Sequence, residues 1–210
     1  MEKQFIQIQL ALFFKNDFQG ILENVSLFIK EQFGSGMTTQ ILGIPANAPS
    51  GIPRLTANSS LVDINLSKNR IDFFSKSEHF TSDHFEKIFN IINEISVEIG
   101  RVGVVLTYFK EAEINELKSI FDQSKLSNLN PKDITVRLNE EITINGVVSN
   151  NSQMYVSGFG DDGRGGKKRG IIITRDINTL QENINTNKFD KETLNKFITD
   201  SIVKASESLI

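Results

Sequence analysis

The sequence predicts an α+β fold, in which about four helices cover one face of a mainly antiparallel, twisted sheet. Two kinds of periodicity predict it. Apolar residues recur at every second position in several segments, as in strands, and at every third or fourth position in others, as in helices. The 210 residues are enough for one sizeable core, so we expect a single domain over residues 1–210.

The first segments predict a strand, a helix and a long connection. Residues 4–14 alternate apolar and polar side chains, with Ile6 on the apolar side, which is typical of a half-buried strand. Asn16 or Asp17 can cap a helix whose apolar stripe runs toward Gly34, a common residue at a helix C-terminus. Residues 35–58 hold three of the four prolines and predict a long loop with a short strand near 38–42.

Residues 60–76 predict a hairpin with a two-residue turn at 68–69. This turn places the apolar residues of both strands on one face, which is an internal check of the register. The expected partners are Ile64 with Phe73 and Leu66 with Ile71. The polar residues of the hairpin face the other way: Asp63, Asn65 and Asp72.

The longest apolar stretch predicts a helix over residues 83–99 that ends at Gly100 and leads into a strand over residues 101–109. Both faces of that strand are mostly apolar, so we expect it in the middle of the sheet. A shorter helix is expected from residue 114 and must end before Pro131.

The C-terminal part predicts three more strands and a helix. Residues 134–144 alternate, and a turn follows at Asn145-Gly146 or at Asn150-Asn151. Residues 153–159 and 170–178 are expected to be strands around a glycine-rich loop. The last helix begins after Asp190, which is expected to cap it.

The order of elements repeats, which predicts two pseudo-repeats, 1–100 and 101–210. LALFFKNDFQGILENV aligns without a gap with the last sixteen residues of VVLTYFKEAEINELKSI, so that Phe14 falls on Phe109 and Leu22 on Leu117. This strand-helix-strands-helix order is similar to that of the saddle-shaped TATA-box-binding proteins. In sequence, SLVDINLSKNRIDFF, RVGVVLTYF and ITRDIN together resemble a sporadically distributed bacterial family of uncharacterised α+β proteins. That resemblance implies a fold and no catalytic residues.

Composition excludes several classes of protein. There is no cysteine, so disulfides and thiolate chemistry are absent, and a cytoplasmic protein is expected. No signal peptide and no membrane-spanning stretch is predicted. The net charge of -3 disfavours a general nucleic-acid binder. Richness in Ile, Asn and Lys suggests an AT-rich bacterial or phage genome.

The basic, glycine-rich segment 158–170, GFGDDGRGGKKRG, is the candidate ligand or partner site. Glycines let backbone N–H groups approach an anion, and the cations add attraction for phosphate or nucleic acid. A solvated hairpin tip is the structural alternative, because no P-loop or dinucleotide signature is present. The candidate residues are Gly163, Arg164, Gly165, Gly166, Lys167, Lys168 and Arg169.

Other polar clusters predict structure more than chemistry. His79 and His84, the only histidines, stand near the start of the 83–99 helix, where Asp83 suits capping. We therefore expect no metal, no cofactor and no catalytic residues. Arg175 and Asp176 follow an apolar run, and one of them is expected to face Asp63 as a cross-strand ion pair.

These observations favour a non-catalytic binding module that engages a protein partner through its polar sheet face and long loops. The first alternative is binding of nucleic acid or a phosphate-bearing ligand by segment 158–170. The second is an enzyme that acts on a phosphorylated small molecule. Exposed sheet edges would also allow a homo-oligomer.

Overall fold

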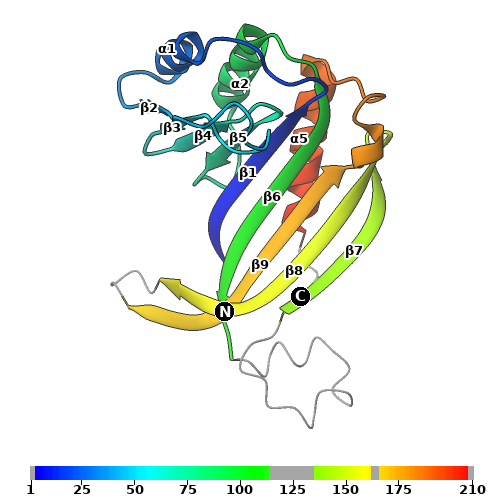
Figure 1. Cartoon of the computed structure of the whole chain (residues 1–210). Helices are drawn as coiled ribbons and strands as arrows, with labels where there is room; N and C mark the ends of the chain where they lie inside the picture. The colour runs from blue at the N-terminus through cyan, green and yellow to red at the C-terminus, as the bar shows by residue number, and fades with distance from the viewer. Residues whose placement is uncertain (1–2, 114–134, 162–165, 208–210) are drawn as a thin grey trace.

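The computed structural model describes residues 3–113, 135–161 and 166–207. Within them, nine strands form one antiparallel sheet in the order β2-β3-β4-β5-β1-β6-β9-β8-β7. The described residues also form three α-helices; in Figure 1, α5 lies behind the central strands, and α1 and α2 lie at the top, above β2–β5. The strands are β1 (Gln4–Phe14), β2 (Thr38–Ile41), β3 (Leu55–Asn58), β4 (Val62–Leu66), β5 (Arg70–Ser75), β6 (Ile99–Glu111), β7 (Thr135–Ile144), β8 (Val147–Asp161) and β9 (Lys167–Thr179). The helices are α1 (Leu22–Phe33), α2 (Ser82–Ile95) and α5 (Lys191–Ser206), with a short 3-10 turn η1 (Gln181–Asn183).

The α+β class and the antiparallel sheet are confirmed, with differences in detail. Three α-helices are present in the described residues rather than about four, because the helix expected from residue 114 lies outside them. The sheet is also larger than expected. Leu55–Asn58, predicted as part of a long loop, forms strand β3 and pairs with both β2 and β4.

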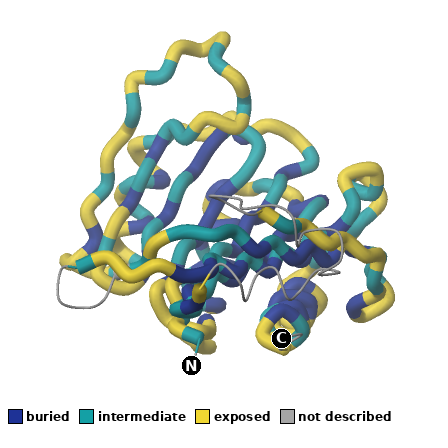
Figure 2. Tube along the Cα trace, turned by 90° about the horizontal axis from the view of Figure 1, so that it is seen from below, coloured by how far each residue is buried: buried dark blue, intermediate teal, exposed yellow. Residues whose placement is uncertain are grey.

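The core lies between the sheet and the helices. Alternate residues of the central strands face the helices and are fully buried, among them Leu10, Val104 and Phe73. In Figure 2 buried residues concentrate in the strands, whereas the connections are mostly exposed. Ile6 was expected on the buried face, but it is 44% exposed, because a bulge between Phe5 and Gln7 shifts the alternation in β1.

The predicted hairpin register is confirmed. Ile64 pairs with Phe73 and Leu66 with Ile71, and the backbone N–H of Ser67 donates to the carbonyl of Arg70 across the turn. The turn at Asn145-Gly146 is the one that forms, because both residues adopt positive φ angles, 51° and 79°. Such angles match the twist of a two-residue hairpin.

The helix boundaries differ from those expected. Helix α1 begins at Leu22, beyond the reach of Asn16 and Asp17 as caps, and it ends at Gly34 as predicted, with φ 83°. Helix α2 ends at Ile95, because Ser96 adopts a left-handed conformation, and residues from Ile99 join strand β6. Its cap is Thr81 rather than Asp83: Thr81 Oγ1 accepts from the backbone N–H of His84 at 3.2 Å. Asp190 caps α5 as expected, accepting from the N–H of Thr193 at 2.8 Å.

The middle of the sheet is the β1–β6 pair. Strand β6 lies between β1 and β9, which confirms its central position. In each half of the chain the first strand lies centrally and the last strand lies beside it, β5 next to β1 and β9 next to β6. The duplication of residues 1–100 and 101–210, and the kinship with saddle-shaped proteins, stay predictions.

Candidate functional site

One face of the sheet is left uncovered by the three helices of the described residues and is called here the helix-free face. It carries a cluster of polar and aromatic side chains. Strands β5, β1, β6 and β9 supply them, with side chains directed away from the helices by the strand alternation. The central members are Gln9, Phe13, Arg70, Asp72, Arg101, Asp176 and Asn178.

Two arginines flank one aromatic ring at the centre of this face. Phe13 of β1 is in register with Arg70 of β5 on one side and with Arg101 of β6 on the other. The guanidinium carbons lie 5.6 Å and 4.6 Å from the ring centroid, within the range of cation–π attraction. We call Arg70, Phe13 and Arg101 the arginine stack.

Arg101 is held by neutral acceptors. Its Nε donates to the carbonyl of Thr179 at 3.0 Å, Nη1 to Gln181 Oε1 at 3.0 Å and Nη2 to Asn178 Oδ1 at 2.9 Å. Burial lowers the pKa of Arg101, and the nearby Asp176 carboxylate opposes that effect. A guanidinium has five N–H donors, so the three bonds fix its plane and leave donors for an external carbonyl or carboxylate.

Asp72 is the buried partner of the arginine stack. Its residue is only 3% exposed, although it stands on the helix-free face, which was expected to be wet. Arg70 Nε lies 3.0 Å from Oδ2, and Gln9 Nε2 donates to Oδ1 at 3.0 Å. Burial raises the pKa of the Asp72 carboxyl above its ordinary value, while Arg70 and Gln9 act in the opposite direction.

The raised pKa of Asp72 predicts a specific pH dependence of stability. Between its ordinary value of 3.8 and its higher folded value, the folded protein binds more protons than the unfolded chain. The contribution of Asp72 to the free energy of unfolding is therefore greatest at acidic pH and falls as the pH rises through this interval. Urea unfolding at a series of pH values measures the free energy of unfolding of the parent and of Asp72→Asn. We expect the value of the parent minus that of the variant to fall from acidic to neutral pH.

Asp190→Asn is the matched control for this measurement. The N–H of Thr193 lowers the pKa of the Asp190 carboxyl, so the sign is reversed. The free energy of unfolding of the parent minus that of Asp190→Asn should rise as the pH increases toward 3.8 and beyond. A difference for Asp72→Asn that is constant or rises with pH would contradict the assignment.

The predicted basic site is mostly part of a hairpin rather than a loop. Gly158–Asp161 pairs with Lys167–Gly170, so strands β8 and β9 extend through most of segment 158–170. Gly166, Lys167, Lys168 and Arg169 stand at the end of this hairpin, and the last three are exposed. Lys168 Nζ lies 2.9 Å from Glu111 Oε2. Gly163, Arg164 and Gly165 lie outside the described residues.

The glycines of this hairpin have a packing role. A Cβ atom on Gly160 or Gly170 would stand 2.7 Å or 2.6 Å from atoms of the Phe109 ring. Phe109 of β6 stands on the helix-free face and is only 4% exposed. Its ring lies against Gly170 of β9 and Gly160 of β8, the positions where these two strands lack side chains. The glycines therefore make room for an aromatic ring, an explanation that the sequence analysis did not consider.

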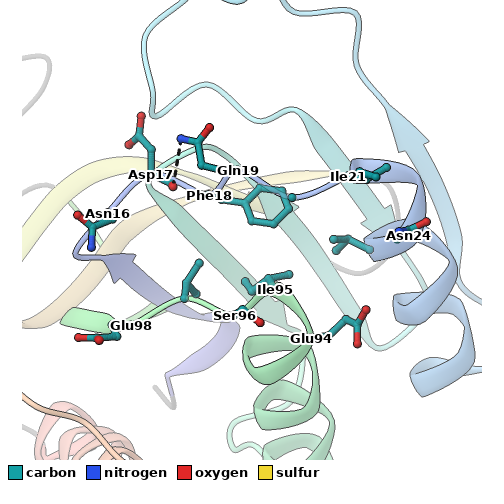
Figure 3. A pocket seen from close by; sticks show the side chains of 13 residues that line it. Asn16, Asp17, Phe18, Gln19, Ile21, Asn24, Glu94, Ile95, Ser96 and Glu98 are labelled. Atoms are coloured by element: carbon teal, nitrogen blue, oxygen red, sulfur yellow. Dashed lines mark hydrogen bonds between the residues drawn. The ribbon is translucent and has the colours of Figure 1, made fainter.

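A separate pocket of about 590 Å³ opens between the β1–α1 connection and the α2–β6 connection. Figure 3 shows its three carboxylates, Asp17, Glu94 and Glu98, on different sides of the space rather than directed at one point. Lys15 Nζ lies 3.2 Å from Glu98 Oε2. In the described part of the chain no group of three or more His, Asp or Glu could hold a metal ion. The negative lining disfavours a phosphorylated ligand.

Arg175 is buried and does not form the cross-strand ion pair that the sequence predicted. It lies on the helix side of β9, in register with Leu106 and Gln153, and is 4% exposed. Its Nε has no hydrogen-bond partner among the described residues. Asp63 is on β4, from which β9 is separated by three strands, so the predicted pair with Asp63 is wrong.

The arginine stack was missed by the sequence analysis because its members come from three distant segments. One signal existed: Phe13 falls on the polar side of the alternating segment 4–14, where an aromatic residue is unexpected. No protein-family model matches the chain, and no curated protein matches it. None of the helices in the described residues has the length and apolar character to cross a bilayer.

Proposed function

We propose that this chain is a non-catalytic binding module that holds a protein partner on the helix-free face of its sheet. The arginine stack is the observation that carries this proposal. Its two guanidinium groups and one ring stand on three adjacent central strands, and Arg101 is fixed by three hydrogen bonds. A rigid group of this kind loses little conformational entropy when a partner binds.

The chemistry of the face favours protein over nucleic acid. Arginine and aromatic side chains are enriched at the energetic centres of protein interfaces. Carboxylates stand among the arginines, since Asp72 pairs with Arg70, and Asp176 accepts from Asn178 at 3.0 Å. A nucleic-acid surface would be more uniformly positive. The remaining donors of Arg101 suit a carboxylate or backbone carbonyl of the partner.

The capture experiment compares variants on two faces of the molecule. Immobilised parent, Arg101→Ala and Phe13→Ala are exposed to an extract of the native host, and retained proteins are quantified. Loss of a central anchor should reduce retention of a genuine partner about tenfold or more. Leu27→Ala and Glu31→Ala on the exposed side of α1 are the matched controls and should retain it as the parent does.

Two results would overturn the proposal. The first is equal retention by Arg101→Ala, Phe13→Ala and the parent, with circular dichroism confirming that all are folded. The second is binding of single-stranded RNA or DNA at low salt that disappears when Arg164, Lys167, Lys168 and Arg169 are replaced by Ser. That loss would place the function at the end of the β8–β9 hairpin instead.

A further inference from the structure

Among the described residues, strand β7 forms one edge of the sheet and has unusual properties for an edge. It runs for ten residues, pairs with β8 at every position without a bulge, and contains neither proline nor lysine. All of it except Ile144 is exposed or half-buried. Natural edge strands are commonly short, bulged, or protected by proline or charged side chains. The charges of β7 are of both signs, Arg137 against Glu140 and Glu141, so a second copy can neutralise them, and a long regular edge then invites another strand.

The turn that follows β7 determines which backbone groups face outward. Ile144 and Val147 close the two-residue turn and therefore exchange hydrogen bonds with each other. Because these bonds alternate along an antiparallel pair, the even-numbered residues of β7 bond to β8. The N–H and C=O groups of the odd-numbered residues, from Thr135 to Thr143, point away from β8.

We propose that two copies of this chain pair through β7, antiparallel, about a two-fold axis at Asn139. This register joins odd-numbered residues to odd-numbered residues, as the outward backbone groups require. It places Arg137 opposite Glu141 of the second copy, twice in the dimer. The other opposed residues are Asn139 with Asn139, Thr135 with Thr143, Val136 with Ile142 and Leu138 with Glu140.

Charge complementarity selects this register over its neighbours. Moving the axis to residue 140 would place Glu140 opposite its own copy, and like charges directly opposite each other destabilise a strand pair. Moving it to residue 138 would place Arg137 opposite Asn139 and Val136 opposite Glu140, which removes both ion pairs. Glu141 has no ion-pair partner within the described part of the chain.

Apolar groups beside the same edge support the pairing. Leu138 is 48% exposed, and Val203 of α5 is 57% exposed. Val203 lines a shallow pocket of about 320 Å³ with Ile142 and Ile144. The two-fold axis is perpendicular to the sheet, so both α5 helices lie on one side. Both arginine stacks then face the opposite side, on one continuous sheet.

Charge reversal tests the proposal in the full chain by analytical ultracentrifugation. The parent should be a dimer. Arg137→Glu and Glu141→Arg each place like charges opposite each other twice, so each should weaken dimerisation about tenfold or more. The double variant Arg137→Glu/Glu141→Arg should restore it. Glu31→Arg, an exposed change on α1, is the charge-matched control and should dimerise as the parent does.

Cysteine cross-linking tests the axis itself, since the chain has no cysteine of its own. Opposed, hydrogen-bonded residues have Cα atoms about 5.5 Å apart, within the span of a disulfide. Asn139→Cys should form a covalent dimer on oxidation, and Thr143→Cys should not. A monomeric parent at about 100 µM, a dimer unaffected by either single reversal, or equal cross-linking of both cysteine variants would each overturn the proposal.

Discussion

Phe73→Ala should lower the free energy of unfolding by about 3–5 kcal/mol. Phe73 is fully buried on β5, where Ile64 and Leu10 are its neighbours on the adjacent strands. Its truncation removes apolar surface from the interior and leaves a cavity that a close-packed sheet can only partly fill. Urea unfolding followed by far-ultraviolet circular dichroism gives the difference directly.

Phe159→Ala is the matched control for that experiment. Phe159 has the same side chain but is 66% exposed near the end of β8. Its replacement should change the free energy of unfolding by no more than about 0.5 kcal/mol. If Phe73→Ala cost less than about 1 kcal/mol, Phe73 would not belong to the close-packed core.

Gly170→Ala should destabilise the fold by about 1–3 kcal/mol. The added Cβ would collide with the backbone carbonyl of Lys110 and stand 2.6 Å from Cζ of Phe109. The carbonyl belongs to the paired strand β6, so relief requires a shift of the backbone rather than a rotamer change. The same urea titration measures the loss.

This second substitution also separates two explanations of the glycine-rich segment. If Gly170 served anion binding at a solvated tip, alanine would leave stability unchanged. Gly36→Ala is the control, because a Cβ there has open space and the residue has no positive φ. It should leave the free energy of unfolding unchanged or raise it slightly.

Sequence periodicity predicted the parts of the fold that depend on local alternation. The register of the β4–β5 hairpin followed from matching apolar sets across a two-residue turn, and the central position of β6 followed from its two apolar faces. Alternation assigns a side chain to one face of a sheet, but it does not say what lies beside it. Asp72 was placed on the correct face, yet its contacts come from Arg70 in the same strand and from Gln9 on the neighbouring strand β1.

For the candidate site, too, sequence alternation did not identify which residues lie side by side. The basic residues near Lys168 attracted attention because they are consecutive in the sequence, whereas Phe13, Arg70 and Arg101 meet only after β1, β5 and β6 have paired. Short strands also escape detection when prolines precede them, as in β3 after Pro53. In each case the missing information was the identity of the neighbouring strand.

The pairing of β1 with β6 has a consequence for how the molecule assembles. Strand β1 leaves the ribosome well before β6, so it finds one of its two partners only after residues 99–111 have been synthesised. Until then the nascent chain carries an open row of backbone donors and acceptors along an apolar strand, a state prone to aggregation. Closing so long a loop also costs entropy before any contact compensates for it, so the topology favours slow folding over rapid collapse.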